Sequence, residues 1–273
     1  MSGAPAALLA SLLWGTADFL AGRASRVHPA VLVALVGQAA GLVALTIILA
    51  IRGVDSGAFL PGALSGVVGS VAILCFYRSL ALGTMSVIAP IVATSSIVPV
   101  VAGVVFDGER PGALQWVGMA LALAGVILAS REPAHTTAID PRRAIQLALI
   151  AAVFIGLALI CLDAAAEHDA LGGVAAARVV GVVVLGALAW RTAARAPLSE
   201  LPKLGGIGLL DTGANTAFAI ATTGGLLSLV SVLGGLFPVV TVALAYLILH
   251  ERLVPVQRVG VALALAGVPL ISV

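Results

Sequence analysis

The sequence predicts an all-α membrane protein with ten transmembrane helices, arranged as two inverted repeats of five helices each. The first observation is composition: 61% of the 273 residues are hydrophobic and only 10% are charged, with a mean hydropathy of +1.20. Such values are typical of proteins that cross a bilayer many times. The second is a series of apolar runs of spanning length with short connections, and the third is a sequence repeat between the two halves.

The repeat is clearest in two apolar segments. Residues 117–130 read VGMALALAGVILAS, and residues 259–272, 142 positions further on, read VGVALALAGVPLIS and differ at three positions. Each segment follows a Glu-Arg pair, at 109–110 and 251–252. Internal duplication of this kind is typical of membrane transporters. We therefore expect a first repeat at residues 1–130, a linker loop at 131–143 and a second repeat at 144–273.

Apolar runs of about 17–25 residues define the predicted helices. They are residues 4–22, 30–51, 59–81, 84–105, 111–129, 144–162, 170–190, 203–222, 225–249 and 255–273. Because each repeat then holds an odd number of helices, the second must enter the membrane from the opposite side, which makes the repeats inverted. The first run follows no basic segment, so we expect it to be a retained helix rather than a signal peptide.

Basic residues are divided unequally between the two predicted sides of the membrane. The side that holds both termini carries Arg52 and Arg110 as its clear bases, beside the acidic cluster of Asp163, Glu167 and Asp169. The opposite side carries most other arginines and the single lysine. Since short cytoplasmic loops are enriched in Lys and Arg, the opposite side is predicted to be cytoplasmic and both termini to lie outside.

Ionisable residues inside the predicted spans are functional candidates, because a charge near the centre of a membrane helix costs about 2.5–3.5 kcal/mol on insertion scales. Asp18 lies late in the first helix, one turn after Trp14, so both share a face. Arg178 lies midway along the seventh helix. Asp211 lies midway along the eighth, with Asn215 one turn further on.

Two interpretations of these residues remain open. They form a polar cavity that binds substrate and a proton, or they form two structural ion pairs, Asp18–Arg78 and Asp211–Arg178. Hydroxyls in the fourth and ninth helices leave the same choice, because they bond their own helix or line a cavity where proline frees backbone carbonyls. The candidate substrate-binding residues are Trp14, Asp18, Tyr77, Ser95, Arg178, Asp211, Asn215 and Ser231.

The segment WGTADFL at 14–20, the Glu-Arg pair before a Gly/Ala/Leu-rich helix and the doubling of that pattern resemble the EamA-type transporters of the drug/metabolite transporter superfamily. The resemblance covers essentially the whole chain. It implies an inner-membrane carrier of small metabolites or drugs, often an exporter, that works by alternating access. It also implies cytoplasmic termini, which is the opposite of what the basic residues predict.

We therefore expect a secondary transporter, with export favoured, that moves a small organic metabolite or drug across the inner (cytoplasmic) membrane. The alternative is a non-transporting membrane scaffold or lipid-interacting protein. No nucleotide-binding, zinc or nucleophile motif occurs in the sequence, so we expect no enzyme activity, cofactor, metal or nucleic-acid partner. The expected partners are the substrate, the lipid bilayer and a proton or another coupling ion. Small-residue faces such as 37–41 suit helix contacts within the bundle or in a homodimer.

Overall fold

In the computed structural model, residues 3–83, 88, 91–129, 139–195, 197–249 and 254–272 are described. Every regular element in these ranges is helical, as the sequence predicts. The α-helices are α1 (Ala4–Ala24), α2 (Ala30–Arg52), α3 (Phe59–Leu82), α5 (Ile97–Val105), α6 (Ala113–Ala129), α7 (Pro141–Arg191), α8 (Leu201–Thr223), α9 (Leu227–Gly234), α10 (Phe237–Leu249) and α11 (Pro255–Ile271). Three 3₁₀ turns accompany them: η1 (Ser56–Ala58), η2 (Thr94–Ser96) and η3 (Leu198–Glu200).

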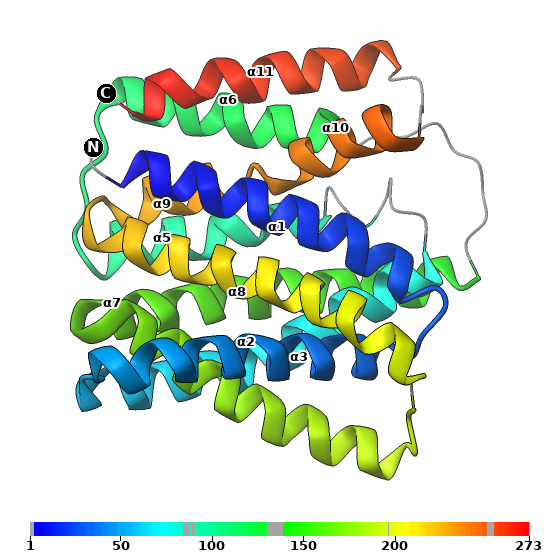
Figure 1. Ribbon diagram of the computed structural model, residues 1–273. Coiled ribbons are helices and arrows are strands. Elements are labelled where there is room, and N and C mark those ends of the chain that lie inside the picture. Colours follow the sequence, from blue (N-terminus) through cyan, green and yellow to red (C-terminus); the bar gives the residue numbers. More distant parts are fainter. Residues whose placement is uncertain are drawn as a thin grey trace.

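The helices lie side by side in one bundle, and the two ends of the chain lie at the same end of it (Figure 1). We call this the terminal end of the bundle, and the other the far end. Most of the predicted linker, 131–138, and the second Glu-Arg pair, 251–252, fall outside the described residues.

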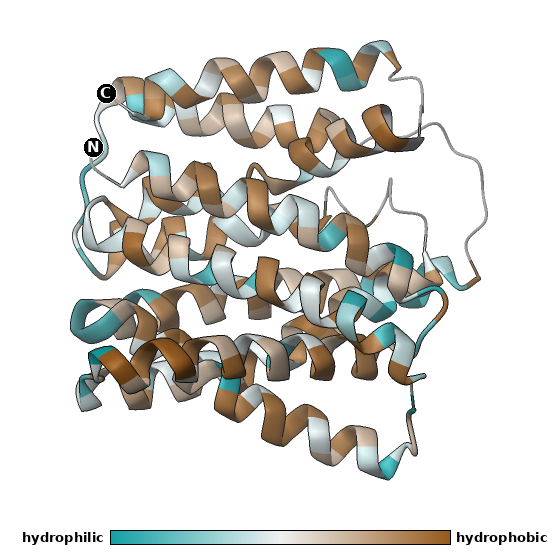
Figure 2. Cartoon of the chain, in the orientation of Figure 1, coloured by the Kyte–Doolittle hydropathy of each residue, from teal (hydrophilic) through white to brown (hydrophobic). Residues whose placement is uncertain are grey.

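Most residues along the lengths of the helices are apolar (Figure 2), and many large apolar side chains are exposed. On α2, for example, Val43, Ile47 and Ile51 form an outward stripe with exposed fractions of 62%, 62% and 87%. Among the described residues, four helical segments are long and apolar enough to cross a membrane: Ala4–Ala24, Ala30–Arg52, Ser56–Leu82 and Pro141–Arg191. Apolar stripes of this length suit contact with lipid rather than water, so the protein is a multi-pass membrane protein.

The α7 element holds two helices that meet at a kink at Asp169, where two separate helices are expected at 144–162 and 170–190. It runs for 51 residues, and its one non-helical residue is Asp169, with φ −158° and ψ 106°. The Asp169 side chain accepts hydrogen bonds from the backbone N–H groups of Leu171 and Gly172, both at 3.1 Å. It therefore caps the following helix directly and makes a loop unnecessary. At about 1.5 Å per residue the whole element exceeds a bilayer of about 30 Å more than twofold, so it suits two crossings.

Breaks occur in the two segments expected to be continuous at 84–105 and 225–249. In the first, η2 precedes α5, where Pro99 lacks the N–H that would bond the Ser95 carbonyl. In the second, α9 ends at Gly234 and α10 starts at Phe237, next to Pro238. A Cβ placed on Gly235 would collide with the Oγ of Ser96. The two breaks are therefore in contact inside the bundle.

The two halves of the sequence pack through close approaches of small residues. At the α2–α8 crossing, a Cβ on Gly208 would collide with the backbone of Gly37, so the two helices touch backbone to backbone. Gly41, one turn after Gly37, meets the Thr212 side chain in the same way. The small-residue face predicted at 37–41 thus makes its contacts within the bundle, as glycine faces do in closely packed membrane helices.

The α6 and α11 helices, which carry the near-identical segments, pack against each other at one edge of the bundle (Figure 1). Gly118 of α6 faces the carbonyl of Gly267 of α11, while Gly125 of α6 faces the carbonyl of Gly260. The repeat offset of 142 residues makes Gly260 the counterpart of Gly118 and Gly267 the counterpart of Gly125, so exchanging the two repeats turns the first contact into the second. Contacts that exchange in this way are the mark of a local two-fold relationship between the two helices.

Candidate substrate-binding site

A cavity lies inside the bundle, walled by α1, α2, α3, α7, α8, the η2 turn and the start of α10. It contains about 990 Å³ of empty space, including the part that is open to solvent. Small-molecule sites are mostly apolar with a few placed polar groups. The cavity shows the same composition, with Ile73, Leu159 and Phe237 among its apolar residues.

Seven of the eight candidate residues line this cavity: Trp14, Asp18, Tyr77, Ser95, Arg178, Asp211 and Asn215. Ser231 does not. It lies in α9 at 1% exposure, one turn before Gly235, which does line the cavity. Gln38 also lines the cavity but was not among the candidates. Its position midway along a predicted span was the signal that could have identified it.

The Arg178 side chain is the centre of a polar network that joins three helices. Its Nη1 lies 2.8 Å from Oδ2 of Asp211 and donates a hydrogen bond of 2.8 Å to Oε1 of Gln38. Gln38 belongs to α2, Arg178 to α7 and Asp211 to α8, so both halves of the chain contribute. Arg178 as a whole is only 5% exposed, and ionic hydrogen bonds are strong where water is excluded.

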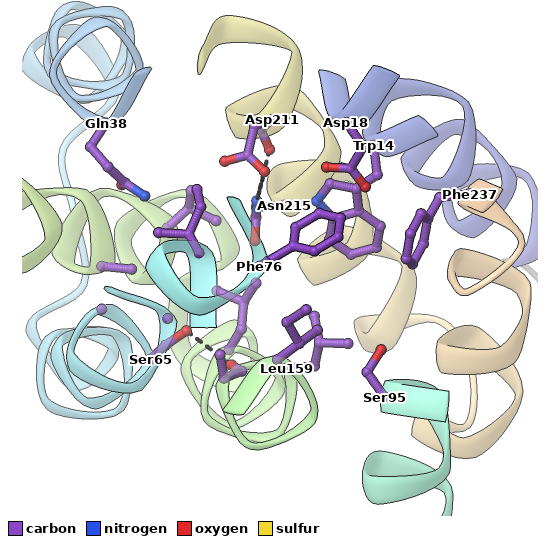
Figure 3. Close-up of a pocket in the computed structure, with 18 of the residues that line it drawn as sticks. Trp14, Asp18, Gln38, Ser65, Phe76, Ser95, Leu159, Asp211, Asn215 and Phe237 are labelled. Atoms are coloured by element: carbon purple, nitrogen blue, oxygen red, sulfur yellow. Dashed lines mark hydrogen bonds between the residues drawn. The ribbon is translucent and has the colours of Figure 1, made fainter. Parts of the chain in front are cut away.

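Asn215 extends the network by one helical turn. Its Nδ2 donates to the backbone carbonyl of Asp211 at 2.7 Å and to the Asp211 carboxylate at 3.3 Å (Figure 3). The Nε of Arg178, by contrast, is buried with no hydrogen-bond partner in the described structure. The ion pair anticipated between Asp211 and Arg178 is thus present, and it lies in the cavity wall rather than away from it. The two interpretations of these residues are therefore compatible.

Asp18 stands apart from this network. The second ion pair considered from the sequence, between Asp18 and Arg78, is absent, because no contact joins the two side chains and Arg78 is exposed. Within the described ranges Asp18 has no hydrogen bond or ion pair. In the close-up its carboxylate lies near the rings of Trp14 and Phe237 (Figure 3). Trp14 in turn packs on Phe218, with ring centroids 5.6 Å apart.

Glu109 makes another polar contact between the halves, at the terminal end. Its carboxylate accepts the backbone N–H groups of Leu227 and Ser228, the latter at 3.0 Å. These are the first residues of α9, and Leu226 before them provides no side-chain cap. Glu109 therefore satisfies donors that the helix leaves free and places a negative charge at the positive end of its dipole. Gly103 leaves the space, since a Cβ there would lie 2.5 Å from Oε2 of Glu109.

The contact made by Glu109 sits in an acidic hollow. The hollow is lined by Asp107, Glu109, Asp163, Glu167, Thr222, Thr223, Gly225 and Leu227. In the described part of the chain, no group of three or more His, Cys, Asp or Glu side chains is placed to hold a metal ion. The terminal end is thus acidic in the structure, in agreement with the charge asymmetry of the sequence.

Comparison with known proteins agrees with this architecture. The model of the EamA-like transporter family matches residues 1–131 and again residues 142–273, so it confirms the resemblance seen at 14–20 and at the Glu-Arg pairs. A protein of known crystal structure is similar over 98% of this chain and 96% of its own, with a TM-score of 0.77 and 20% sequence identity. At that identity the similarity establishes the fold alone. No curated protein matches the chain in sequence.

The Arg178–Asp211 pair leads to a double-mutant prediction. Asp211→Asn leaves a buried guanidinium without its counter-ion and should lower the free energy of unfolding by about 3 kcal/mol. Adding Arg178→Gln removes the stranded charge and should restore most of that loss. Denaturant unfolding in detergent micelles measures both. Glu200→Gln, which breaks the exposed pair with Lys203, is the control and should change stability by less than about 1 kcal/mol. A double variant as unstable as Asp211→Asn would show that Arg178 does not depend on this partner.

Proposed function

Because this chain belongs to the EamA-like transporter family, and is therefore a membrane transporter of small molecules rather than an enzyme, we propose that it is a secondary carrier that exports a small organic metabolite or drug across the cytoplasmic membrane by alternating access. The observation that carries the proposal is the cavity, whose polar groups Gln38, Arg178 and Asp211 come from both halves of the chain. Secondary carriers bind substrate near the bilayer midplane, between their repeats. A mostly apolar cavity with a few placed polar groups favours a carrier over a scaffold protein.

We further propose that the halves at 1–130 and 144–273 are inverted five-helix repeats, which gives ten crossings in all. The exchanged glycine contacts between α6 and α11 support a two-fold relationship. So does a second pair of contacts: Gly37 of α2 meets Gly208 of α8, while Gly66 of α3 meets the backbone of Ala177 in α7. By the offset of 142 residues, Gly208 is the counterpart of Gly66, and the counterpart of Gly37 lies within one helical turn of Ala177. The two contacts are therefore related by exchange of the repeats. Both chain ends at one end of the bundle also suit an even number of crossings.

Alternating access then requires the two halves to move about the cavity. The Glu109 contact with the first turn of α9 favours the state in which the terminal end is closed, because it ties the halves together there. Opening that end requires this contact to break. Arg178, Asp211 and Gln38 bridge the halves near the cavity and must rearrange in the same step. Asp211 is the candidate coupling site, because loss of its negative charge would leave Arg178 without a counter-ion.

Transport by purified protein is the direct test. Proteoliposomes should take up labelled small organic solutes faster than protein-free liposomes, and a pH gradient should drive accumulation if a proton is the coupling ion. If Asp211 is the coupling site, Asp211→Asn should abolish gradient-driven accumulation yet retain substrate exchange. Full recovery of driven transport by the Asp211→Asn/Arg178→Gln double variant would exclude Asp211 as that site. Failure of a broad panel of solutes to enter above the protein-free rate would contradict the proposed carrier.

The Glu109 contact predicts an effect on access to the cavity. In a background with Cys75 and Cys161 replaced by Ala, a thiol at Ala177→Cys reports on the cavity wall. Adding Glu109→Gln should raise its labelling by an impermeant maleimide from the terminal side by about tenfold, because a hydrogen bond to a charged group contributes on the order of 1.5–3 kcal/mol. Glu167→Gln removes a carboxylate from the same hollow and should leave the rate unchanged. Equal rates in both variants would refute a closing role for Glu109.

The basic residues of the far end predict the orientation in the membrane. Alkaline phosphatase fused after Val273 should be active, because the terminal end is expected to face the periplasm. The same reporter placed in the 130–143 loop should be inactive. The reverse pattern of activities would instead support the cytoplasmic termini that the family resemblance implies.

A further inference from the structure

The acidic side chains that line the cavity outnumber the basic ones. Asp18, Asp211 and Arg178 are its charged side chains among the described residues. Arg178 and Asp211 are in contact at 2.8 Å and offset each other. Asp18 has no hydrogen bond or ion pair within the described ranges, so when all three are ionised the cavity carries one negative charge in excess.

An ionised carboxylate in a half-buried, mostly apolar site is costly unless it acquires a partner. A ligand that brings a positive charge removes that cost, because an ammonium group donates strong charge-assisted hydrogen bonds to a carboxylate. The surroundings of Asp18 suit such a group. Trp14 and Phe237 lie beside it in the close-up (Figure 3), and aromatic faces attract cations.

The rest of the wall argues against a second, negative group on the ligand. The guanidinium of Arg178 is already bonded to Asp211 and Gln38, so it has little charge to offer a carboxylate. Phe76 and Tyr77, with ring centroids 5.9 Å apart, provide apolar surface for the body of the ligand.

We propose that the substrate is a monovalent organic cation, an amine with an aromatic or aliphatic body and no carboxylate, whose ammonium group binds Asp18. This inference rests on the proposed transport function and specifies the substrate class for the same cavity. It assigns different roles to the two acids: Asp211 holds Arg178, and Asp18 holds the ligand.

Four probes with one ring and nearly one chain length separate the charge classes: phenethylamine (cation), phenylalanine (zwitterion), hydrocinnamate (anion) and phenylethanol (neutral). Calorimetric titration of the purified protein in detergent near neutral pH should show phenethylamine binding at least about tenfold more tightly than the others, a difference of about 1.4 kcal/mol. Tighter or equal binding of phenylalanine or hydrocinnamate overturns the proposal, and so does the absence of binding by all four.

Variants of Asp18 assign the effect to this residue. Asp18→Asn should abolish the preference for phenethylamine over phenylethanol, whereas Asp18→Glu should retain a preference for the cation. Asp163→Asn, which removes a carboxylate from the acidic hollow outside the cavity, is the matched control and should bind as the unaltered protein does. Melting temperatures in detergent exclude misfolding, and a preference that survives in a folded Asp18→Asn variant defeats the proposal.

Flux of the same four probes into proteoliposomes distinguishes the two levels of inference. Transport of phenylalanine but not phenethylamine would refute the substrate class and leave the carrier function intact. Binding of phenethylamine that depends on Asp18, with no flux of any probe, would support the binding site and count against the carrier function.

Discussion

The buried guanidinium of Arg178 constrains much of the interior. A charge near the centre of a membrane protein must find partners inside the protein, because lipid offers none. Arg178 finds them in Gln38 of α2 and Asp211 of α8, so it ties its own helix to one helix from each half. The packing around it is correspondingly close, since a Cβ on Gly181 would lie 2.9 Å from Oε1 of Gln38. The polar wall of the cavity and the close packing behind it thus depend on the same side chain.

The positions of the helices could be predicted because each follows a long apolar run in the sequence. The geometry of their interruptions could not be predicted in this way. A loop was expected between 162 and 170, whereas the two helices of α7 meet at Asp169, whose carboxylate caps the second helix and leaves a single non-helical residue. Such a cap depends on backbone geometry that composition does not report. The breaks at η2 and between α9 and α10 were suggested only by their prolines. Their mutual contact, Gly235 against Ser96, is a tertiary feature beyond local sequence.

The cavity residues were likewise predictable only in part. Polar residues in apolar spans are few, so Asp18, Arg178 and Asp211 could be found from the sequence, and all three line the cavity. What the sequence left open was which acid pairs with which base. Asp18 and Arg78 were plausible partners by depth alone, but in the structure Arg78 is exposed and makes no contact with Asp18. Depth along a helix is readable from a sequence, whereas direction around it requires the packing of neighbouring helices.

The contacts between α6 and α11 have a consequence for how the two halves can change. Gly118 with Gly267 and Gly125 with Gly260 form a self-complementary surface, equivalent to the interface between two copies of one half-length chain. A larger side chain introduced in either helix disturbs one of the two contacts and leaves its symmetric counterpart intact. In a dimer of identical half-length chains the same substitution would damage both. In a single polypeptide that contains both halves, a substitution in one half therefore need not be accompanied by the same substitution in the other. This freedom permits an asymmetric cavity, in which one acid is paired and the other is not.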